Sequence, residues 1–193
     1  VQPILAESDS GPKVVPNAVS PDHERTLTRE LYGGYVRNQQ QQGFYVFQDE
    51  YYAAPAAIVD YEDPGNHRNH FIYLQGMWFN GIESLVHGRA THNYDDYIAV
   101  KFFATSVNAV LGGEAGIASK VWITLDGQNL NESNQGTDIS IDADGRSYVL
   151  VEESRMYYLV KLGEIESHEL RISSNEEYFS IFAFTFGAYA DTP

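Results

Sequence analysis

Alternating apolar and polar positions dominate the chain from Phe44 onward. The stretch KVWITLDG (120–127) shows the pattern most clearly, because every second residue is aliphatic. Successive side chains of a strand point to opposite faces, so the two sets separate. One face would carry Val121, Ile123 and Leu125, and the other Lys120, Trp122 and Thr124.

Similar runs recur along the chain and are separated by turn residues. They occupy 44–48, 70–79, 97–113, 120–127, 137–145, 147–163, 168–173 and 178–187. Asp126-Gly127 and Asp144-Gly145 are dipeptides typical of tight turns between strands. About nine short strands without a strand–helix–strand rhythm predict an all-β fold, a two-sheet antiparallel sandwich of the jelly-roll kind.

Two segments precede these runs. Residues 1–22 contain four prolines and no helical period, which predicts an extended N-terminal arm before a sandwich domain over 23–193. In 23–43, Thr26 or Thr28 could cap one short helix that ends at Gly33 and Gly34, followed by a solvated loop at 39–42. The apolar residues of the arm are Val1, Ile4, Leu5, Val14, Val15 and Val19.

The charge balance narrows the partners. Twelve basic residues stand against 27 acidic ones, giving a net charge of −15. Such a surface repels nucleic-acid phosphates and anionic membranes, although it could attract divalent cations. No run of apolar residues is long enough to cross a membrane. We therefore expect neither nucleic-acid binding nor membrane insertion.

The residue inventory argues against catalysis. Cysteine is absent, which excludes disulfides, thiolate metal sites, a cysteine nucleophile and a CxxC redox motif. The sequence has no HEXXH motif, no G-x-S-x-G elbow and no phosphate-binding glycine loop. Glycoside hydrolysis needs two carboxylates at a defined separation, and among 27 acidic residues no particular pair stands out. We expect a protein that is not an enzyme and has no obligatory cofactor.

Aromatic residues supply the first candidate binding site. The loop THNYDDY (91–97) and a neighbouring strand could present flat rings to the apolar face of a sugar, with an amide for its hydroxyls. The candidate residues are Asn93, Tyr94, Tyr97 and Trp122. Packing of these rings within the core or an interface is the favoured alternative, and Trp78 is expected in the core.

Acidic and imidazole groups supply weaker candidates for a metal site. Asp138, Asp142 and Asp144 could offer oxygen ligands to calcium, but the loop lacks the terminal Glu, and a hairpin turn is the favoured interpretation. His67 and His70 lie near Asp63, where solvated loop histidines are favoured over metal ligands. A separate sequon, Asn131-Glu132-Ser133, is a candidate for N-glycosylation.

Several stretches together resemble a known domain. ERTLTRELYGGY, LQGMW, KFFATSVNAVLGG, SRMYYLVK and FAFTFG are similar, in order and spacing, to the domain that follows the thioredoxin fold in DipZ-type and related bacterial thioredoxin-like proteins. The resemblance covers roughly 25–187. It implies a jelly roll like that of carbohydrate-binding modules, facing the periplasm or the cell exterior. The redox motif of such proteins lies in the thioredoxin domain, which this chain lacks.

Two functions therefore remain open. The first is a non-catalytic, extracytoplasmic module that binds a carbohydrate or a partner protein. The second is a structural subunit of an extracellular filament, in which the arm over 1–22 docks on the next copy by strand addition. Val1 in place of a first Met favours an exported, processed chain, and a trimmed chain is the alternative.

Overall fold

Eleven strands and three short helices make up residues 23–188, the part of the chain that this computed structural model describes. The helices are a 3₁₀ turn (His23–Arg25), a π-helical turn (Val36–Gln40) and α1 (Asp49–Ala53). The strands are β1 (Leu31–Tyr32), β2 (Ile58–Tyr61), β3 (Phe71–Asn80), β4 (Leu85–His87), β5 (Tyr97–Gly112), β6 (Ser119–Leu125), β7 (Gln128–Asn129), β8 (Ser140–Ile141), β9 (Ser147–Val151), β10 (Arg155–Ser174) and β11 (Ser180–Gly187).

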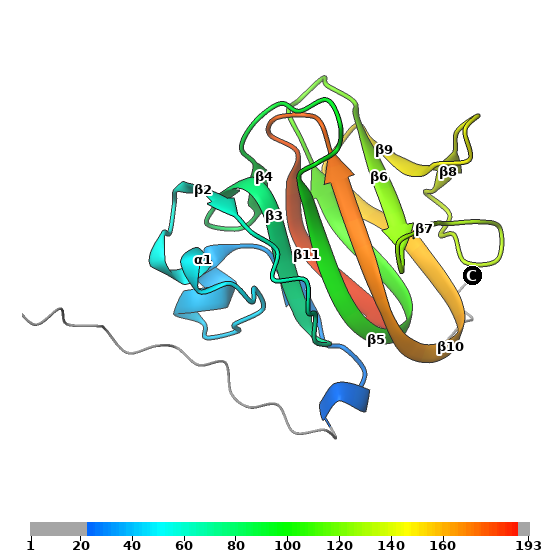
Figure 1. The fold of residues 1–193 in the computed structure, drawn as a ribbon, viewed down its shortest axis with the longest axis horizontal. Helices are drawn as coiled ribbons and strands as arrows, with labels where there is room; N and C mark the ends of the chain where they lie inside the picture. The colour runs from blue at the N-terminus through cyan, green and yellow to red at the C-terminus, as the bar shows by residue number, and fades with distance from the viewer. Residues whose placement is uncertain (1–22, 189–193) are drawn as a thin grey trace, which may run out of the picture.

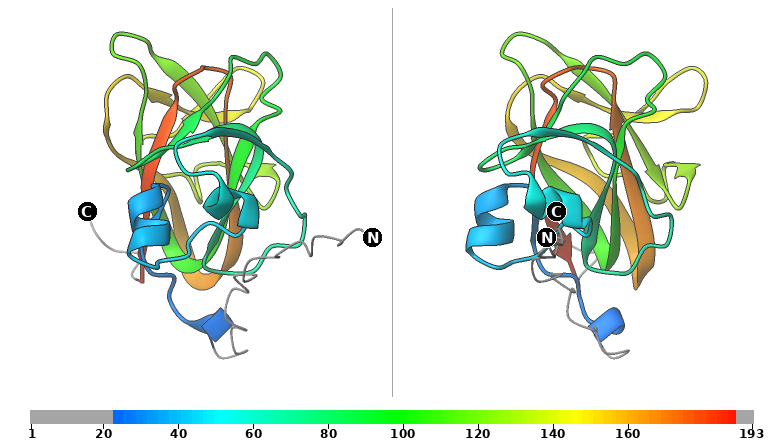
Figure 2. Two further views of the ribbon diagram at one scale, coloured as in Figure 1. Left: turned by 90° about the vertical axis from the view of Figure 1, so that its left-hand side faces the viewer. Right: turned by 60° about the vertical axis from the view of Figure 1, so that its left-hand side comes forward.

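The strands form an antiparallel β-sandwich, which confirms the prediction of an all-β sandwich (Figure 1). Hydrogen bonding follows the order β1-β11-β4-β3-β5-β10-β6-β9-β8, with β2 beside β3 and β7 beside β6. The sheet curls over on itself, so that its inner face encloses the core (Figure 2). The predicted arm over 1–22, with its docking role, lies outside the described residues and stays a prediction.

Strands β5 and β10 carry both layers because each changes its inward-facing side along its length. Apart from Ala99 and Gly112, which are also buried, the buried positions of β5 are even-numbered up to Ala104 and odd-numbered from Thr105. In β10 a bulge falls between Tyr158 and Val160, and a second lies between Lys161 and Glu166. Bulges bend a strand and shift its alternation, which lets one strand pass from one layer to the next.

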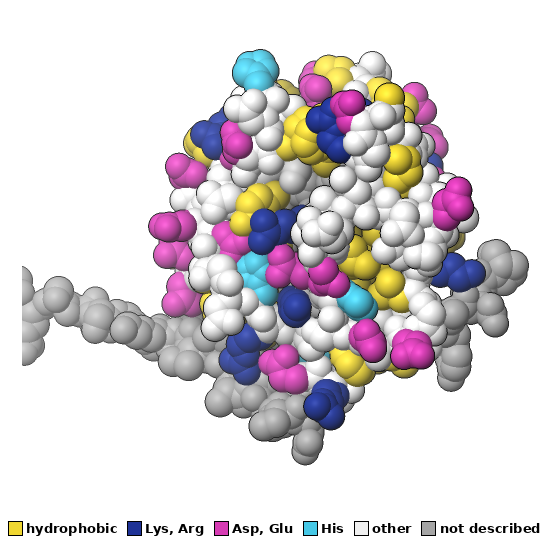
Figure 3. All heavy atoms as spheres, turned by 45° about the vertical axis from the view of Figure 1, so that its right-hand side comes forward, with side chains coloured by type: hydrophobic (Ala, Val, Ile, Leu, Met, Phe, Trp, Pro, Cys, Tyr) yellow, Lys and Arg dark blue, Asp and Glu magenta, His cyan; other side chains and the backbone are white. Residues whose placement is uncertain are grey.

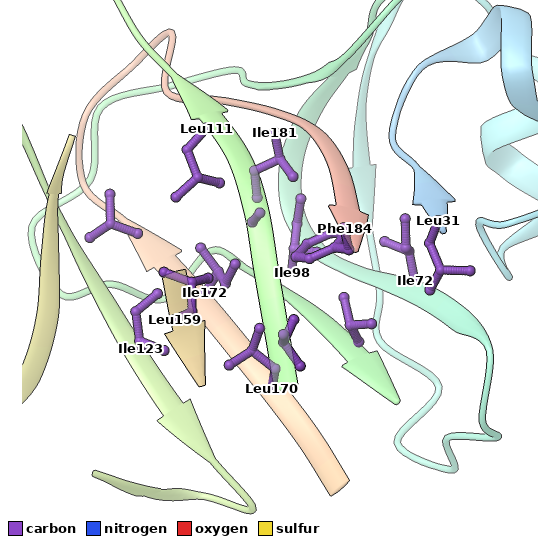
Figure 4. Packing of buried hydrophobic residues seen from close by; sticks show 14 of the residues in the cluster. Leu31, Ile72, Ile98, Leu111, Ile123, Leu159, Leu170, Ile172, Ile181 and Phe184 are labelled. Carbon is purple, nitrogen blue, oxygen red and sulfur yellow. The ribbon is translucent and has the colours of Figure 1, made fainter. Parts of the chain in front are cut away.

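The core lies between the layers. Paired residues of four neighbouring strands form one inward row of Leu74, Ile98, Ile172 and Ile123, all fully buried. Figure 4 shows side chains of this core, including Leu111, Ile181 and Phe184, gathered between the strands. Trp78 is also fully buried, as predicted.

The predicted helix over 23–43 is wrong in position. Leu31 and Tyr32 form β1, which pairs with β11, and the π-helical turn begins only at Val36. Gly33 and Gly34 do not end a helix. A Cβ atom on Gly34 would lie 2.3 Å from a backbone atom of Glu83, so this glycine is needed for close chain approach. No helix within residues 23–188 is long and apolar enough to cross a membrane.

A buried carboxylate fixes the loop between β4 and β5. Asp96 accepts two hydrogen bonds from Arg89, at 2.6 and 2.8 Å, one from His87 at 3.0 Å and one from the Met77 amide at 3.1 Å. Burial opposes the charged form, but these bonds outweigh it and lower the pKa of Asp96. The network holds both ends of the segment from Arg89 to Asp96.

Gly76 packs directly against the Asp96 carboxylate, so replacing this glycine tests the network. Gly76 has a φ of +86°, and a Cβ atom there would lie 2.1 Å from Asp96 Oδ1. We expect Gly76→Ala to lower the free energy of unfolding by about 3–5 kcal/mol, because the buried Asp96 carboxylate must give up its bonds to buried His87 and half-exposed Arg89. Urea unfolding measures the loss.

Gly145→Ala is the matched control, since Gly145 has a φ of +78° and nothing within 4 Å of the added carbon. That variant should lose only the backbone cost of about 1–2 kcal/mol. Equal losses in the two variants would contradict the role given to Asp96.

Candidate functional site

The outward face of the neighbouring strands β5, β10, β6 and β9 carries a row of aromatic residues. Tyr97 of β5 pairs with Ser173 of β10, Ser173 with Trp122 of β6, and Trp122 with Tyr148 of β9. Directly paired residues point to the same side of a sheet, so these four side chains form one lateral line, the aromatic row. Their burial is intermediate, whereas Ile98, Ile172 and Ile123 of the adjacent positions are fully buried.

Each ring of the aromatic row contacts a cation. Arg171 lies over Tyr97 at 4.5 Å from the ring centroid, Arg146 over Trp122 at 4.7 Å, and Lys120 over Tyr148 at 4.3 Å. Such contacts hold cations and rings together by the electrostatic field of the ring face.

Carboxylates balance these cations. Asp142 lies 3.2 Å from Lys120 and 3.3 Å from Arg146, and Glu169 accepts a hydrogen bond from Arg171 at 3.0 Å. Figure 3 shows basic, acidic and imidazole side chains mixed with hydrophobic ones on this side of the molecule. The face therefore offers donors, acceptors and flat rings without a strong net sign of charge.

The loop before β5 covers one face of Trp122. Tyr94 stacks on the indole with centroids 3.8 Å apart and planes inclined by 10°. The Tyr94 amide donates to Asn175 Oδ1 at 2.8 Å, and Tyr94 has a positive φ of 56°, a strained conformation for a bulky residue. Because Tyr94 occupies one face of the indole, the Arg146 guanidinium occupies the other. The indole Nε1 is buried without a hydrogen-bond partner.

A second loop, residues 62–70, fixes the Tyr97 end of the row. The Tyr97 hydroxyl donates to Asp63 Oδ2 at 2.5 Å. His67 lies between two carboxylates, with Nε2 2.5 Å from Asp63 Oδ1 and Nδ1 2.8 Å from Glu169 Oε2. Its ring stacks on Tyr73 at 3.9 Å. We call Asp63, His67 and Glu169 the His67 clamp.

The clamp shifts the pKa values of its members. Burial disfavours the imidazolium of His67, but the hydrogen bonds with Glu169 and Asp63 outweigh it and raise its pKa. The hydrogen bond from His67 lowers the pKa of Glu169, and bonds from Tyr97 and His67 lower that of Asp63 against the effect of burial. Burial and the bond to Asp63 raise the pKa of Tyr97 to about 12.

The structure brings most of the predicted aromatic site together. Tyr94 and Trp122 are in contact, and Asn93 is exposed in the Tyr94 loop. Tyr97 is separated from Trp122 by one intervening strand, β10, at Ser173. The expectation of solvated loop histidines is wrong. The His67 side chain is 4% exposed, and His70 is buried with Nδ1 2.9 Å from Thr28 Oγ1.

Sequence reasoning missed the partners of these rings. Glu169, Arg171 and Arg146 carry no motif, and Glu169 is 102 residues from His67. Only the position of Arg171 on the outward side of an alternating strand could have suggested a place on this face.

The predicted calcium ligands do not gather at one point. Asp138 binds Arg155 at 2.8 Å and the Tyr158 amide at 2.7 Å, whereas Asp142 and Asp144 pair with Arg146. Residues 142–145 form the hairpin turn between β8 and β9, as the favoured interpretation predicted. Within residues 23–188, no group of three histidine or acidic side chains could hold a metal ion.

The candidate glycosylation site lies in an exposed turn. Ser133 Oγ donates to Asn131 Oδ1 at 2.6 Å, and residues 131–133 are all exposed. The sequon is therefore accessible, and its modification stays a prediction.

Comparison with known proteins gives one family. A family model described as a thioredoxin like C-terminal domain matches residues 28–187, which include every strand from β1 to β11. No curated protein matches the chain.

The stack of Tyr94 on Trp122 can be tested by fluorescence, because the chain has only two tryptophans and Trp78 is fully buried. We expect Tyr94→Ala to raise the acrylamide-quenchable fraction of the emission, since one face of Trp122 becomes exposed. The loss of the ring pair should lower the free energy of unfolding by about 0.5–1.5 kcal/mol.

Tyr158→Ala provides the control, because Tyr158 is 51% exposed and takes no part in the stack of Tyr94 on Trp122. That variant should leave quenching unchanged. If Tyr94→Ala also left it unchanged, the ring would not shield Trp122 in solution.

Proposed function

We propose, from the premise that this chain belongs to the family of thioredoxin-like C-terminal domains, that it is a non-catalytic module that binds carbohydrate on the aromatic row. A partner protein is the alternative occupant. The proposal includes the finer fold assignment, a jelly roll like that of carbohydrate-binding modules. It also includes a place outside the cytoplasm, where the glycans of cell surfaces and matrices are accessible.

The aromatic row is the single observation that supports the proposal. Tyr97 and Trp122 lie on either side of β10, and their backbones are roughly 10 Å apart because neighbouring strands are about 4.8 Å apart. Ser173 between them is small and only partly buried. Tyr94 and Arg146 cover the two faces of Trp122, so a sugar chain would contact the outward edges of these rings and the charged groups beside them.

The polar groups beside the rings suit hydroxyl groups. Arg171, Arg146 and Lys120 are donors only, whereas Glu169 and Asp142 are acceptors, and a sugar hydroxyl both donates and accepts. Cation–carboxylate pairs at the edge of the rings therefore offer both kinds of partner. A nucleic acid would need an excess of cations, which this face does not have.

A non-catalytic role fits the engagement of the acidic groups. Asp63 accepts from Tyr97, Asp96 from Arg89 and His87, and Asp142 lies beside Lys120 and Arg146. Each of these carboxylates is held in the charged form, as the lowered pKa values of Asp63, Asp96 and Asp142 indicate. A general acid needs the opposite shift.

A glycan array tests the ligand class directly. We expect the protein to retain a defined set of polysaccharides, and Trp122→Ala and Tyr97→Ala each to weaken binding by about tenfold, which corresponds to the loss of one ring contact. Titration calorimetry with the retained glycan measures the affinities.

Tyr158→Ala is the control here as well, because it removes an exposed tyrosine outside the aromatic row. Its affinity should equal that of the unmodified protein. If the protein retained no glycan, the carbohydrate ligand would be refuted. If all three variants lost affinity equally, the glycan would not bind on the aromatic row.

A further inference from the structure

His67 joins a loop to the sheet through both of its ring nitrogens. Nε2 contacts Asp63 of its own loop, and Nδ1 contacts Glu169 of β10, at 2.5 and 2.8 Å. A neutral imidazole has one N–H donor, whereas two carboxylates on two nitrogens require two donors. The geometry of the His67 clamp is therefore that of an imidazolium.

The clamp also holds Tyr97, at one end of the aromatic row, and Arg171, which lies over the Tyr97 ring. Asp63 accepts the Tyr97 hydroxyl with the oxygen that His67 does not use. Glu169 likewise accepts Arg171 Nε with its second oxygen, and the Arg171 guanidinium lies over the Tyr97 ring. Each carboxylate thus links His67 to one residue of the ligand face.

We propose that the His67 clamp is a pH-dependent positioning device, in which charged His67 fixes Tyr97 and Arg171 for binding and neutral His67 releases the loop over 62–70. This inference rests on the proposed function, since it assigns the regulation of the same face. The clamp residues are positioning residues.

The charges around His67 define the direction of the effect. Asp63 and Glu169 favour its charged form, and their own charged forms are favoured in return. The other groups packed around the clamp are Tyr73 of β3, Tyr97 of β5, Arg171 of β10, and the pair of Glu24 with Arg68. Lys101 of β5 stands opposite Glu169 in the sheet.

The pH window follows from these shifts. The pKa of His67 is raised in the folded state, so its stabilising effect is complete below the unfolded value of about 6.5 and is lost as the pH rises through the folded value. The pKa values of Asp63 and Glu169 are lowered, so their effect is lost only as the pH falls through those values. The clamp closes between the two limits.

The first experiment needs no ligand. Nuclear magnetic resonance of imidazole-labelled protein should show both His67 nitrogens protonated at pH 6, and a titration midpoint above that of His67 in the urea-unfolded chain. The ¹³Cζ resonance of Tyr97 should move with the same midpoint. A midpoint at or below the unfolded value, or a Tyr97 signal that ignores it, would overturn the proposal.

Trypsin reports the release of the loop. Cleavage at Arg68-Asn69, followed by mass spectrometry and normalised to a free peptide of residues 62–72, should be roughly tenfold faster once His67 is neutral, as expected when a charge-assisted hydrogen bond is lost. His67→Gln should be cleaved fast at every pH. Equal cleavage of the unmodified protein across the titration would also overturn the proposal.

His168→Gln is the matched control. His168 precedes Glu169 in β10 and its Nδ1 lies 2.6 Å from the Asp126 carboxylate, but its ring is not hydrogen-bonded to Asp63, His67 or Glu169. Its cleavage should keep the pH dependence of the unmodified protein. If this variant abolished that dependence, His168 and not His67 would control the loop, and the proposal would be overturned.

The ligand experiment separates this proposal from the one on which it rests. Native gels that contain hydroxyethylcellulose or xylan should retard the protein less at pH 9 than at pH 6, and His67→Gln should show the weaker retardation at both values. Absence of any retardation contradicts the carbohydrate ligand while the ligand-free measurements still decide the clamp. Retardation that is equal at both pH values refutes the regulation of the face.

Discussion

The register of β10 between β5 and β6 is the constraint on which the site depends. The same alignment that places Ile172 beside Ile98 and Ile123 in the core places Ser173 between Tyr97 and Trp122 outside. A slip of one residue would expose the isoleucines and bury the outward residues, so the hydrophobic effect on one face determines the layout of the other. This register holds only for the second half of β10, from Glu166 onward, because the bulges before it change the side of the strand that faces inward.

Part of this arrangement could be predicted from the sequence. The alternation in 120–127 placed Lys120, Trp122 and Thr124 on one face, and the structure gives them intermediate burial while their neighbours are buried. The bulge between Tyr158 and Val160 could not be predicted, since the run over 147–163 shows no break there. The short-range pattern therefore predicted the two faces of β6, but not which strands are its neighbours.

The errors have a common physical origin in long-range contacts. Gly33 and Gly34 read locally as a helix end, yet the backbone atoms of Ile181 and Glu83 leave no space for side chains at these positions. His67 read as a solvated loop residue, because its partner Glu169 is 102 residues away. Local propensity cannot register a partner that the fold supplies, and the residues with such partners are those that hold the site together.

The unpaired indole N–H of Trp122 has a consequence for how this face divides its free energy between folding and recognition. A buried donor without an acceptor costs about 1–3 kcal/mol, and stacking with Tyr94 and Arg146 is what offsets it. The strained backbone of Tyr94 adds to that cost. The stack is thus a point of local frustration in the sheet. An acceptor that reached this nitrogen would recover a hydrogen bond that the folded chain alone leaves unmade.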